Sequence, residues 1–268
     1  MDKARLMEFG RIDQTGNPAH FIDFLDAACA AASFQAYKRR MNELLGLASG
    51  KTVLDMGCGT GDDVREMARF VGEQGQVVGV DNSQAMIAEA EGRAANSNLP
   101  VSFQLAEASR LPFADGSFDG SRADRSLMHV PDARQAIAEM ARVTKTGGPV
   151  VVFEVDFETL TIDTDERVMA RKVIHTWTDI FRNGWLGRHV PALFRELGLR
   201  EIAVIPYVLQ LTPPLALPIL GAATVEKAVE KGTLTAEEGQ AWLQHVAELQ
   251  RTERFFSTMT GFLVAGRK

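Results

Sequence analysis

Glycines and a carboxylate gather in one short segment of this chain, VLDMGCGTG at residues 53–61. An apolar run ends in an acid, glycines follow at every second position, and a helical pattern starts at Asp62. A buried strand, a glycine turn and a helix in this order present a nucleotide-like ligand at the end of the first strand of an α/β sheet. Because glycine lacks a Cβ atom, its backbone can approach such a ligand closely. The predicted ligand-binding residues of this segment are Asp55, Gly57, Cys58, Gly59 and Gly61.

The spacing of the glycines argues against a dinucleotide. A dinucleotide fingerprint reads G-x-G-x-x-G and seats a pyrophosphate on the helix N-terminus. Here the third glycine comes one residue early, and Asp62 and Asp63 open the helix. Two carboxylates suit the helix dipole, but they would repel a pyrophosphate, which disfavours a nicotinamide oxidoreductase. The turn suits a ligand with a cationic end and no phosphate there, a description that S-adenosyl-L-methionine fits.

Further segments follow in the order of a known family. They are VVGVD at 77–81, AEASRLPF at 106–113, FD at 118–119, LMHVPD at 127–132 and TGGP at 146–149. Together with the glycine turn, they resemble the motifs of class I S-adenosylmethionine-dependent methyltransferases, in particular the ubiquinone/menaquinone-type small-molecule group. The resemblance covers roughly residues 34–156 and extends weakly to the C-terminus.

The resemblance implies how the cofactor is held. Asp81 ends the second strand, where its carboxylate can accept both ribose hydroxyls; alternatively it caps the helix that begins near Ser83. Asp55 and the glycine backbone would face the methionine end and favour its ammonium group, unless Asp55 is a structural turn acid. Asn82 and Met86 would flank the adenine, although Met86 could be a core residue of its helix.

Two further segments belong to this expected cofactor site. Ala106-Glu107-Ala108 stands where the family more often has Gly-Asp-Ala. The Glu107 carboxylate could accept from the adenine amine and the Ala108 N–H could bond a ring nitrogen, or Glu107 is simply solvated. Asp124 and Arg125 follow the fourth strand at the ligand crevice. We expect these two residues either to contact the methionine moiety or to form a surface ion pair with each other.

Methyl transfer requires little from side chains, because the sulfonium already activates the methyl group. Placement of the reactants alone can contribute roughly 7–11 kcal/mol. A nucleophile can also need a general base, and His129 is the first candidate because it follows the fourth strand and can titrate near pH 7. The alternative is a structural histidine at a helix start. The next candidates are His175, His189, Glu154 and Asp156.

The chain carries more aromatic and aliphatic residues than a minimal methyltransferase core needs. They favour a moderately hydrophobic small-molecule acceptor, or they pack a lid onto the sheet. We predict substrate contacts for Tyr37, His175 and Trp185. Tyr37, Arg39 and Arg40 could instead reach the cofactor carboxylate or form a solvated helix face. The apolar residues in question are Phe157, Leu160, Trp177, Phe181, Trp185, Tyr207, Leu215, Leu217, Leu220 and Phe256.

Helical spacing predicts two helices between residues 18 and 46 that cover the cofactor cleft. Strands and helices then alternate, which is typical of βαβ units. We predict a doubly wound, seven-stranded, mostly parallel Rossmann-like α/β sheet with N-terminal helices and a helical lid and insertion. The strands are expected near residues 52–56, 76–81, 101–105, 117–123, 148–154, 201–211 and 259–266. The expected parts are an N-terminal cap (1–50), a cofactor-binding core (51–156), and a lid, last strands and insertion (157–268), integrated with the core.

Composition limits the other classes of function. A net charge of −6 without a basic run argues against nucleic acid as a partner. Cys29 and Cys58 lack metal-ligand spacing, so neither a metal site nor a disulfide is expected. The N-terminus lacks the apolar region of a signal peptide, and the longest apolar stretch, at 215–223, is too short to span a bilayer. We therefore expect a cytoplasmic protein and leave a homodimer possible.

The expected function is methyl transfer from S-adenosyl-L-methionine to O, N or C of a small molecule by in-line displacement. The alternative is an enzyme that binds the same cofactor and catalyses a cyclisation or isomerisation. A non-catalytic binding subunit is a third possibility, which the intact glycine turn disfavours.

Overall fold

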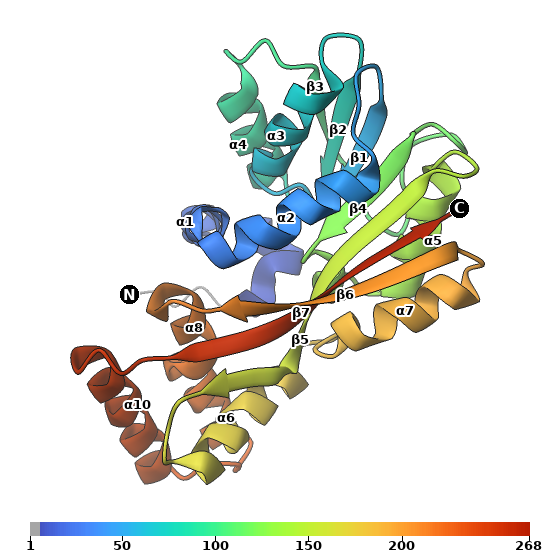
Figure 1. The fold of residues 1–268 in the computed structure, drawn as a ribbon. Helices are drawn as coiled ribbons and strands as arrows, with labels where there is room; N and C mark the ends of the chain where they lie inside the picture. Colours follow the sequence, from blue (N-terminus) through green and yellow to red (C-terminus); the bar gives the residue numbers. More distant parts are fainter. Residues whose placement is uncertain (1–5) are drawn as a thin grey trace.

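Apolar strands form the centre of the structure. The computed structural model describes residues 6–268 and contains a seven-stranded sheet in the order β3-β2-β1-β4-β5-β7-β6 (Figure 1). Strands β1 to β5 are parallel to one another, and β7 runs antiparallel between β5 and β6. The predicted mostly parallel sheet is confirmed. The strands are β1 (Thr52–Met56), β2 (Gln76–Asp81), β3 (Val101–Leu105), β4 (Gly120–Asp124), β5 (Pro149–Ile162), β6 (Arg200–Gln210) and β7 (Ser257–Arg267).

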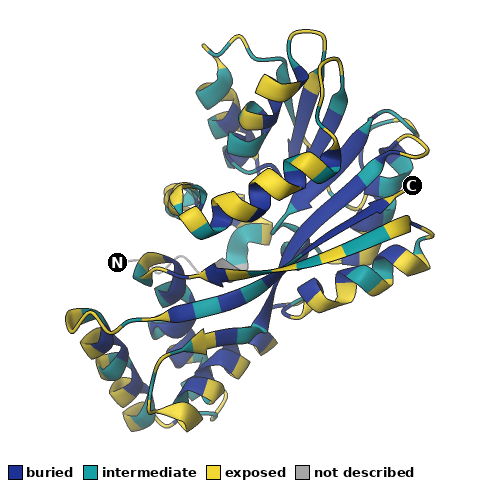
Figure 2. Cartoon of the chain, viewed as in Figure 1, coloured by how far each residue is buried: buried dark blue, intermediate teal, exposed yellow. Residues whose placement is uncertain are grey.

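Helices cover both faces of the sheet, so β1, β4 and the first half of β5 are buried on both sides, as parallel strands usually are (Figure 2). Figure 1 shows α2 in front of the sheet and α5 and α7 behind it. The helices are η1 (Leu6–Gln14), α1 (Pro18–Ala30), α2 (Ala32–Leu45), α3 (Asp62–Val71), α4 (Gln84–Ala94), η2 (Leu127–His129), α5 (Ala133–Val143), α6 (Arg167–Ile180), α7 (Leu186–Glu196), α8 (Pro213–Leu220), α9 (Ala222–Glu230) and α10 (Ala236–Arg251).

Strand β5 is longer than the sequence predicts. It continues past residue 154 to Ile162, because its second half pairs with β7 beyond a register shift between Asp156 and Thr161. Phe157 and Leu160 are therefore buried strand residues, and the expectation of a lid that starts at Phe157 is wrong for this stretch. The helices of the predicted lid region are α6 and α7, and a lid role for them stays a prediction. Gly198, with φ +77, follows the end of α7, where a left-handed glycine commonly terminates a helix.

The predicted helical insertion between β6 and β7 is present as α8, α9 and α10. Thr235 and Glu238 form a capping box at the start of α10. The fully buried Trp242 of α10 donates its Nε1–H to the Leu220 carbonyl at 2.8 Å, which ties α10 to α8. Helix α6 packs on β5, α8 and α9, so the insertion and the lid are connected.

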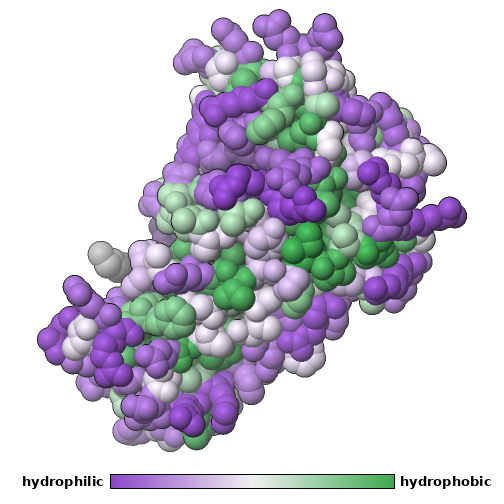
Figure 3. Space-filling model, in the orientation of Figure 1, coloured by the Kyte–Doolittle hydropathy of each residue, from purple (hydrophilic) through white to green (hydrophobic). Residues whose placement is uncertain are grey.

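One apolar core extends from α2 through the sheet to α10. This continuity supports the expected integration of the C-terminal part with the core, which stays a prediction. At the edge of the sheet, β6 exposes Val204 and Val208, and apolar surface shows in the middle of this face in Figure 3. Within residues 6–268, no helix is both long enough and apolar enough to cross a membrane.

Candidate functional site

A cavity of about 560 Å³ lies at the carboxyl ends of β1, β2 and β4, in the size range of small-molecule sites. We call it the cofactor cavity. Open α/β sheets bind ligands at this edge. The predicted cofactor-binding residues that line it are Gly57, Gly59, Asp81, Asn82, Met86, Ala106, Glu107, Ala108, Asp124 and Arg125, together with His129. The residues Asp55, Cys58 and Gly61 do not line it.

The glycine turn is held tightly against the neighbouring strand. The N–H groups of Gly57 and Cys58 donate to the Val80 carbonyl at 2.8 and 2.9 Å. Gly57 has φ +75, and a Cβ atom built on it would lie 2.3 Å from the Ser126 Cβ. Gly61 has φ +71, and a Cβ atom built on it would contact the Phe103 ring. Packing within the protein therefore requires glycine at both positions.

Asp81 is fixed by two backbone donors. Gly59 N–H donates to its Oδ2 and Ser83 N–H to its Oδ1, each at 3.0 Å. The capping residue of α4 is Ser83, whose Oγ accepts from Met86 N–H at 3.3 Å, so Asp81 is not the cap. Burial raises the pKa of Asp81, although both hydrogen bonds oppose the shift. The carboxylate lines the cofactor cavity with acceptor capacity to spare.

An N-terminal segment that the sequence analysis missed also builds this site. Element η1 contributes Phe9, Gly10 and Ile12 to the cavity wall. Its Asp13 accepts from Ser83 Oγ at 2.6 Å and from Gln84 N–H at 2.7 Å. Burial raises the pKa of Asp13, but these hydrogen bonds outweigh it and the net shift is downward. The Asp13 carboxylate lies at the first N–H groups of α4, where it complements the helix dipole.

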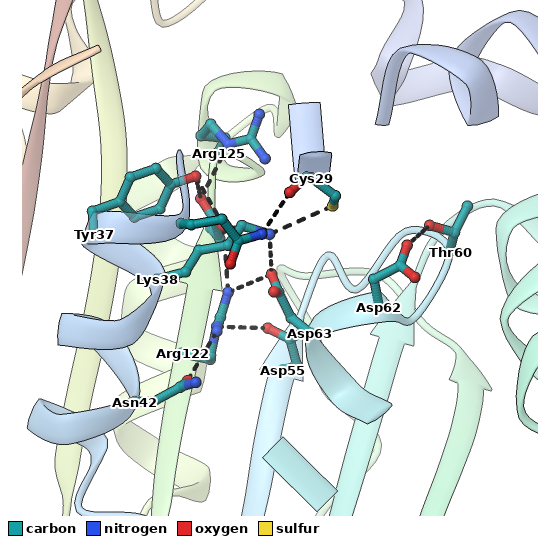
Figure 4. A network of polar contacts seen from close by, with 12 residues as sticks. Cys29, Tyr37, Lys38, Asn42, Asp55, Thr60, Asp62, Asp63, Arg122 and Arg125 are labelled. Carbon is teal, nitrogen blue, oxygen red and sulfur yellow. Dashed lines mark hydrogen bonds and ion pairs between the residues drawn. The ribbon is translucent and has the colours of Figure 1, made fainter. Parts of the chain in front are cut away.

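Asp55 faces away from the cofactor cavity into a buried charge network (Figure 4). We use this name for Lys38, Asp55, Asp63, Arg122 and Asp124. Arg122 is fully buried in β4, with Nε 3.2 Å from Asp55 Oδ1 and Nη2 2.8 Å from Asp63 Oδ2. Burial raises the pKa of Asp55 to about 7, opposed by Arg122. Because Asp55 does not line the cofactor cavity, this geometry does not favour the predicted contact between its carboxylate and the cofactor ammonium.

The buried charge network fastens the N-terminal helix α2 to the core. Lys38 Nζ lies 2.7 Å from Asp63 Oδ2 and 3.6 Å from Asp124 Oδ2. Beside it, the Tyr37 hydroxyl donates to Asp124 Oδ1 at 3.0 Å, and the Tyr37 ring stacks on Phe153 with 3.6 Å between centroids. Tyr37 is fully buried and does not line the cofactor cavity. Its surroundings favour positioning of Asp124 over substrate contact.

The two carboxylates that open α3 have basic partners. Asp62 pairs with Arg65, and with Arg93 Nη1 at 3.3 Å, while Asp63 belongs to the buried charge network. Their repulsion of a phosphate is weaker than the sequence suggests, because these partners balance their charge. The argument against a dinucleotide therefore depends mainly on the glycine spacing.

Asp124 and Arg125 are both paired and cavity-lining. Arg125 Nε lies 3.2 Å from Asp124 Oδ1, and the two side chains are 13% and 6% exposed. The pair is thus largely buried, and the alternative of a surface ion pair is wrong. Arg125 has φ +52, and its guanidinium lies 4.7 Å from the Phe34 ring centroid. Opposite charges stand next to each other on the cavity wall.

His129 lies on η2 at the cavity wall, 5.2 Å from the Phe9 ring and 5.7 Å from the Phe181 ring between centroids. The segment is held by the Leu127 N–H, which donates to Glu154 Oε1 at 2.6 Å. Burial, followed by repulsion from Arg125, lowers the pKa of His129 to about 3. The imidazole is therefore neutral at pH 7 and a weak base, which does not favour the predicted general-base role.

The other base and substrate candidates lie outside the cofactor cavity. Burial raises the pKa of Glu154 to about 8, and Asp156 is buried against Arg188. His175 and Trp185 are exposed; both contact Glu158, at 3.0 and 3.1 Å. His189 is exposed on α7. Substrate contacts by His175 and Trp185 are thus not supported by their placement. No group of three or more possible metal ligands occurs within residues 6–268.

A second, smaller pocket of about 70 Å³ adjoins the cofactor cavity. We call it the side pocket. It shares Phe9, Phe24, Arg125, Met128, His129 and Phe181 with the larger cavity. Its remaining walls are apolar and come from α2, β5, α6, α8 and the ends of β6 and β7. These residues are Phe34, Val155, Phe157, Trp177, Leu211, Leu215, Ile219 and Met259.

The sheet order, the glycine turn and the carboxylate at the end of β2 define a class I S-adenosylmethionine-dependent methyltransferase. The chain belongs to the family described as "Methyltransferase domain", whose profile matches residues 47–191. The resemblance noted from the sequence is thereby confirmed.

Individual relatives agree with this family. The chain is 35% identical over 262 residues to an uncharacterised 37.1 kDa protein in transposon Tn4556 of Streptomyces fradiae, covering 96% of this chain and 74% of that protein. It is 31% identical over 201 residues to a demethylmenaquinone methyltransferase of Shouchella clausii, covering 69% and 86%. The crystal structure of YcgJ from Bacillus subtilis has the same fold, with a TM-score of 0.61, 19% identity, and coverage of 87% of this chain and 98% of that one.

Proposed function

We propose that S-adenosyl-L-methionine binds in the cofactor cavity and that the protein transfers its methyl group to a moderately hydrophobic small molecule. The observation that carries this proposal is the Asp81 carboxylate, which Gly59 and Ser83 hold beside the glycine turn. A carboxylate has about four acceptor positions, and the two backbone donors leave room for both ribose hydroxyls. The free acceptor positions of the Asp81 carboxylate thus fit the ribose of a nucleoside without a phosphate.

The two ends of the cofactor find different surroundings. Asn82, Met86, Glu107 and Ala108 line the part of the cavity next to Asp81, where we place the adenine. We place the amino-acid end at Asp124 and Arg125, because a zwitterion needs neighbouring groups of both signs.

Behind this end, the buried charge network holds Asp124 in place. Arg122 Nη2 lies 3.4 Å from Asp124 Oδ2 while its Nε pairs with Asp55. Asp55 thus acts as a positioning residue through Arg122. Mechanistically, it contributes to the methionine end without touching it.

The chemistry follows from placement. When bound, the cofactor supplies a methyl group that its sulfonium has already activated. The residues of this chain orient it and exclude water, and placement of this kind contributes roughly 7–11 kcal/mol. His129 is neutral in its buried environment. Its imidazole can therefore accept a hydrogen bond from the methyl-accepting molecule, but it is too weak a base to remove a proton from that molecule efficiently.

We propose a small molecule as the acceptor because the side pocket is small and apolar. The net charge of −6 disfavours a nucleic acid. The S. clausii relative carries the name of an enzyme that acts on demethylmenaquinone, which supports an apolar acceptor.

The test is incubation of the purified protein with S-adenosyl-L-methionine that carries a trideuterated methyl group and a panel of phenolic, enolic and amine acceptors. We expect a product heavier by one labelled methyl group, and a strongly reduced yield with Asp81→Asn. An acceptor that is converted without gaining the label contradicts methyl transfer and assigns a cyclisation or isomerisation instead.

A further inference from the structure

The short N-terminal element η1 contacts both η2 and α4. Its chain bends at Arg11, whose φ of −150 and ψ of 39 are not helical. Before the bend, Gly10 packs so closely on η2 that a Cβ atom built on it would lie 3.0 Å from the His129 carbonyl oxygen. After the bend, Asp13 accepts from N–H groups at the start of α4. Because η2 follows β4 and α4 follows β2, with β1 between these strands, η1 bridges two sides of the cofactor cavity.

Asp13 is the polar fastening of η1. Its Oδ1 accepts from the Ser83 hydroxyl at 2.6 Å and from the Ala85 N–H at 3.2 Å. Its Oδ2 accepts from the Gln84 N–H at 2.7 Å. The two N–H groups belong to the first turn of α4, where they have no partner within the helix. Ser83 also donates its N–H to Asp81 Oδ1, so Asp13 is bonded to a residue that holds the carboxylate assigned to the ribose.

The apolar contacts of η1 are partly separate from the main core. Ile12 is buried in a small cluster with Phe21 of α1 and Met86 of α4, and this cluster is distinct from the main core. Phe9 packs against both clusters. Segments with few buried contacts open at a lower free energy than the whole protein. We therefore expect that η1 can detach while the sheet stays folded.

A cofactor in the cavity has contacts to gain from η1. Phe9, Gly10 and Ile12 line the cavity together with Met86, beside which we place the adenine. The bound cofactor therefore touches η1 when η1 is docked and loses these contacts when η1 is detached. A ligand shifts an equilibrium between two states by the difference in its affinity for them.

We propose that Asp13 is a positioning residue that holds η1 over the bound cofactor, and that docking of η1 and binding of the cofactor stabilise each other. This inference rests on the proposed function and adds the means by which the same site retains its cofactor. Breaking the bonds of Asp13 frees η1, removes one wall of the cavity and speeds release of the cofactor. Because such coupling is reciprocal, the bound cofactor also holds η1 in place.

The first test is the dissociation rate of S-adenosylhomocysteine from the immobilised full-length protein, measured by surface plasmon resonance. Asp13→Asn keeps the shape of the side chain and removes its charge and one acceptor oxygen. Hydrogen bonds to a charged acceptor are worth about a ten- to hundredfold change in an equilibrium constant, and we expect release to be faster by about this factor. The matched control Asp23→Asn removes the same charge at an exposed position outside the cavity wall and leaves the rate unchanged.

The second test is backbone hydrogen exchange of residues 6–14 with and without S-adenosylhomocysteine. We expect the ligand to slow exchange of η1 in the wild type and to slow it much less in Asp13→Asn. Faster release from Asp13→Asn with the same ligand-dependent protection of η1 overturns the proposal, because Asp13 then only supports Asp81. Equal release rates in the two proteins, or no protection of η1 in the wild type, overturn it as well.

A second variant loosens the other end of η1 without changing a charge. Gly10→Ala places a Cβ atom 3.0 Å from the His129 carbonyl oxygen, whereas a Cβ atom on Gly92 of α4 meets nothing within 4 Å. We expect faster release from Gly10→Ala and an unchanged rate for Gly92→Ala. If Asp13→Asn does not fold, this pair and the protection of η1 in the wild type decide the question. Failure of the wild type to bind S-adenosylhomocysteine is a separate result, which contradicts the proposed function instead.

Discussion

Substitution of Gly57 by alanine tests how the glycine turn is built. The new methyl group would stand 2.3 Å from the Ser126 Cβ and 2.8 Å from its Oγ, at a backbone φ of +75. Ser126 is itself anchored, since its Oγ donates to the Met56 carbonyl at 3.1 Å. Ser126 cannot move aside without disturbing β1 or the segment that carries His129. Gly46 is a matched control, because its φ is +67 and a Cβ atom there meets nothing within 4 Å.

Both alanine variants lose stability through backbone strain, and Gly57→Ala loses more through a steric clash. A left-handed conformation costs an L-residue about 1–2 kcal/mol, and both alanines incur it. Overpacking adds about 1–3 kcal/mol for Gly57→Ala alone. We therefore expect a loss of about 1–2 kcal/mol of unfolding free energy for Gly46→Ala and about 2–5 kcal/mol for Gly57→Ala. A domain in the middle of the ordinary stability range of about 5–15 kcal/mol survives either change.

The assay combines urea unfolding with calorimetric titration of S-adenosylhomocysteine. We expect Gly57→Ala to weaken ligand binding strongly and Gly46→Ala to leave it unchanged. Ser126→Gly removes the clashing atoms, so the double variant Gly57→Ala/Ser126→Gly should recover stability relative to Gly57→Ala. Equal stabilities and affinities for the two alanine variants would refute the packing argument.

Three further predictions concern buried charge. Arg122→Met leaves Asp55 and Asp63 without their shared partner, so we expect a loss of about 3–5 kcal/mol in urea unfolding at pH 7; an unchanged midpoint contradicts the buried charge network. Burial raises the pKa of Glu154 to about 8, so the folded protein binds a proton that the unfolded chain releases. Its contribution is present below the unfolded pKa of about 4.3 and is lost as pH rises through about 8. The free energy of unfolding, measured from pH 4 to 9, should decline less with pH in Glu154→Gln than in the wild type. Parallel pH curves for the two proteins count against a protonated Glu154. Because His129 has a pKa of about 3, His129→Gln should remove no inflection between pH 5 and 8 from the kcat profile, and loss of one there restores His129 as the base.

The features predicted well from sequence are those that local backbone requirements dictate. The glycines of the turn and the acid after β2 are set by the conformation of a few consecutive residues. The same is true of the strand positions, since a buried parallel strand needs a continuous apolar run. Even there the reason for Gly57 was incomplete, because its contact with Ser126 joins residues far apart in the chain.

The features that were missed depend on contacts between distant segments. Arg122 stands among small residues in β4, and its partners Asp55 and Asp63 come together with it only when the sheet and α3 are assembled. The role of Asp13 depends in the same way on α4. An arginine inside a strand that the sheet order buries is the signal that would have pointed to the network.

The most direct test of the central claim is calorimetric titration of the wild type and Asp81→Asn with S-adenosylhomocysteine. We expect one site per chain in the wild type. The affinity of Asp81→Asn should be weaker by about 1.5–3 kcal/mol, the usual worth of hydrogen bonds to a charged acceptor. Absence of binding by the folded wild-type protein, or an identical affinity in Asp81→Asn, would contradict the account.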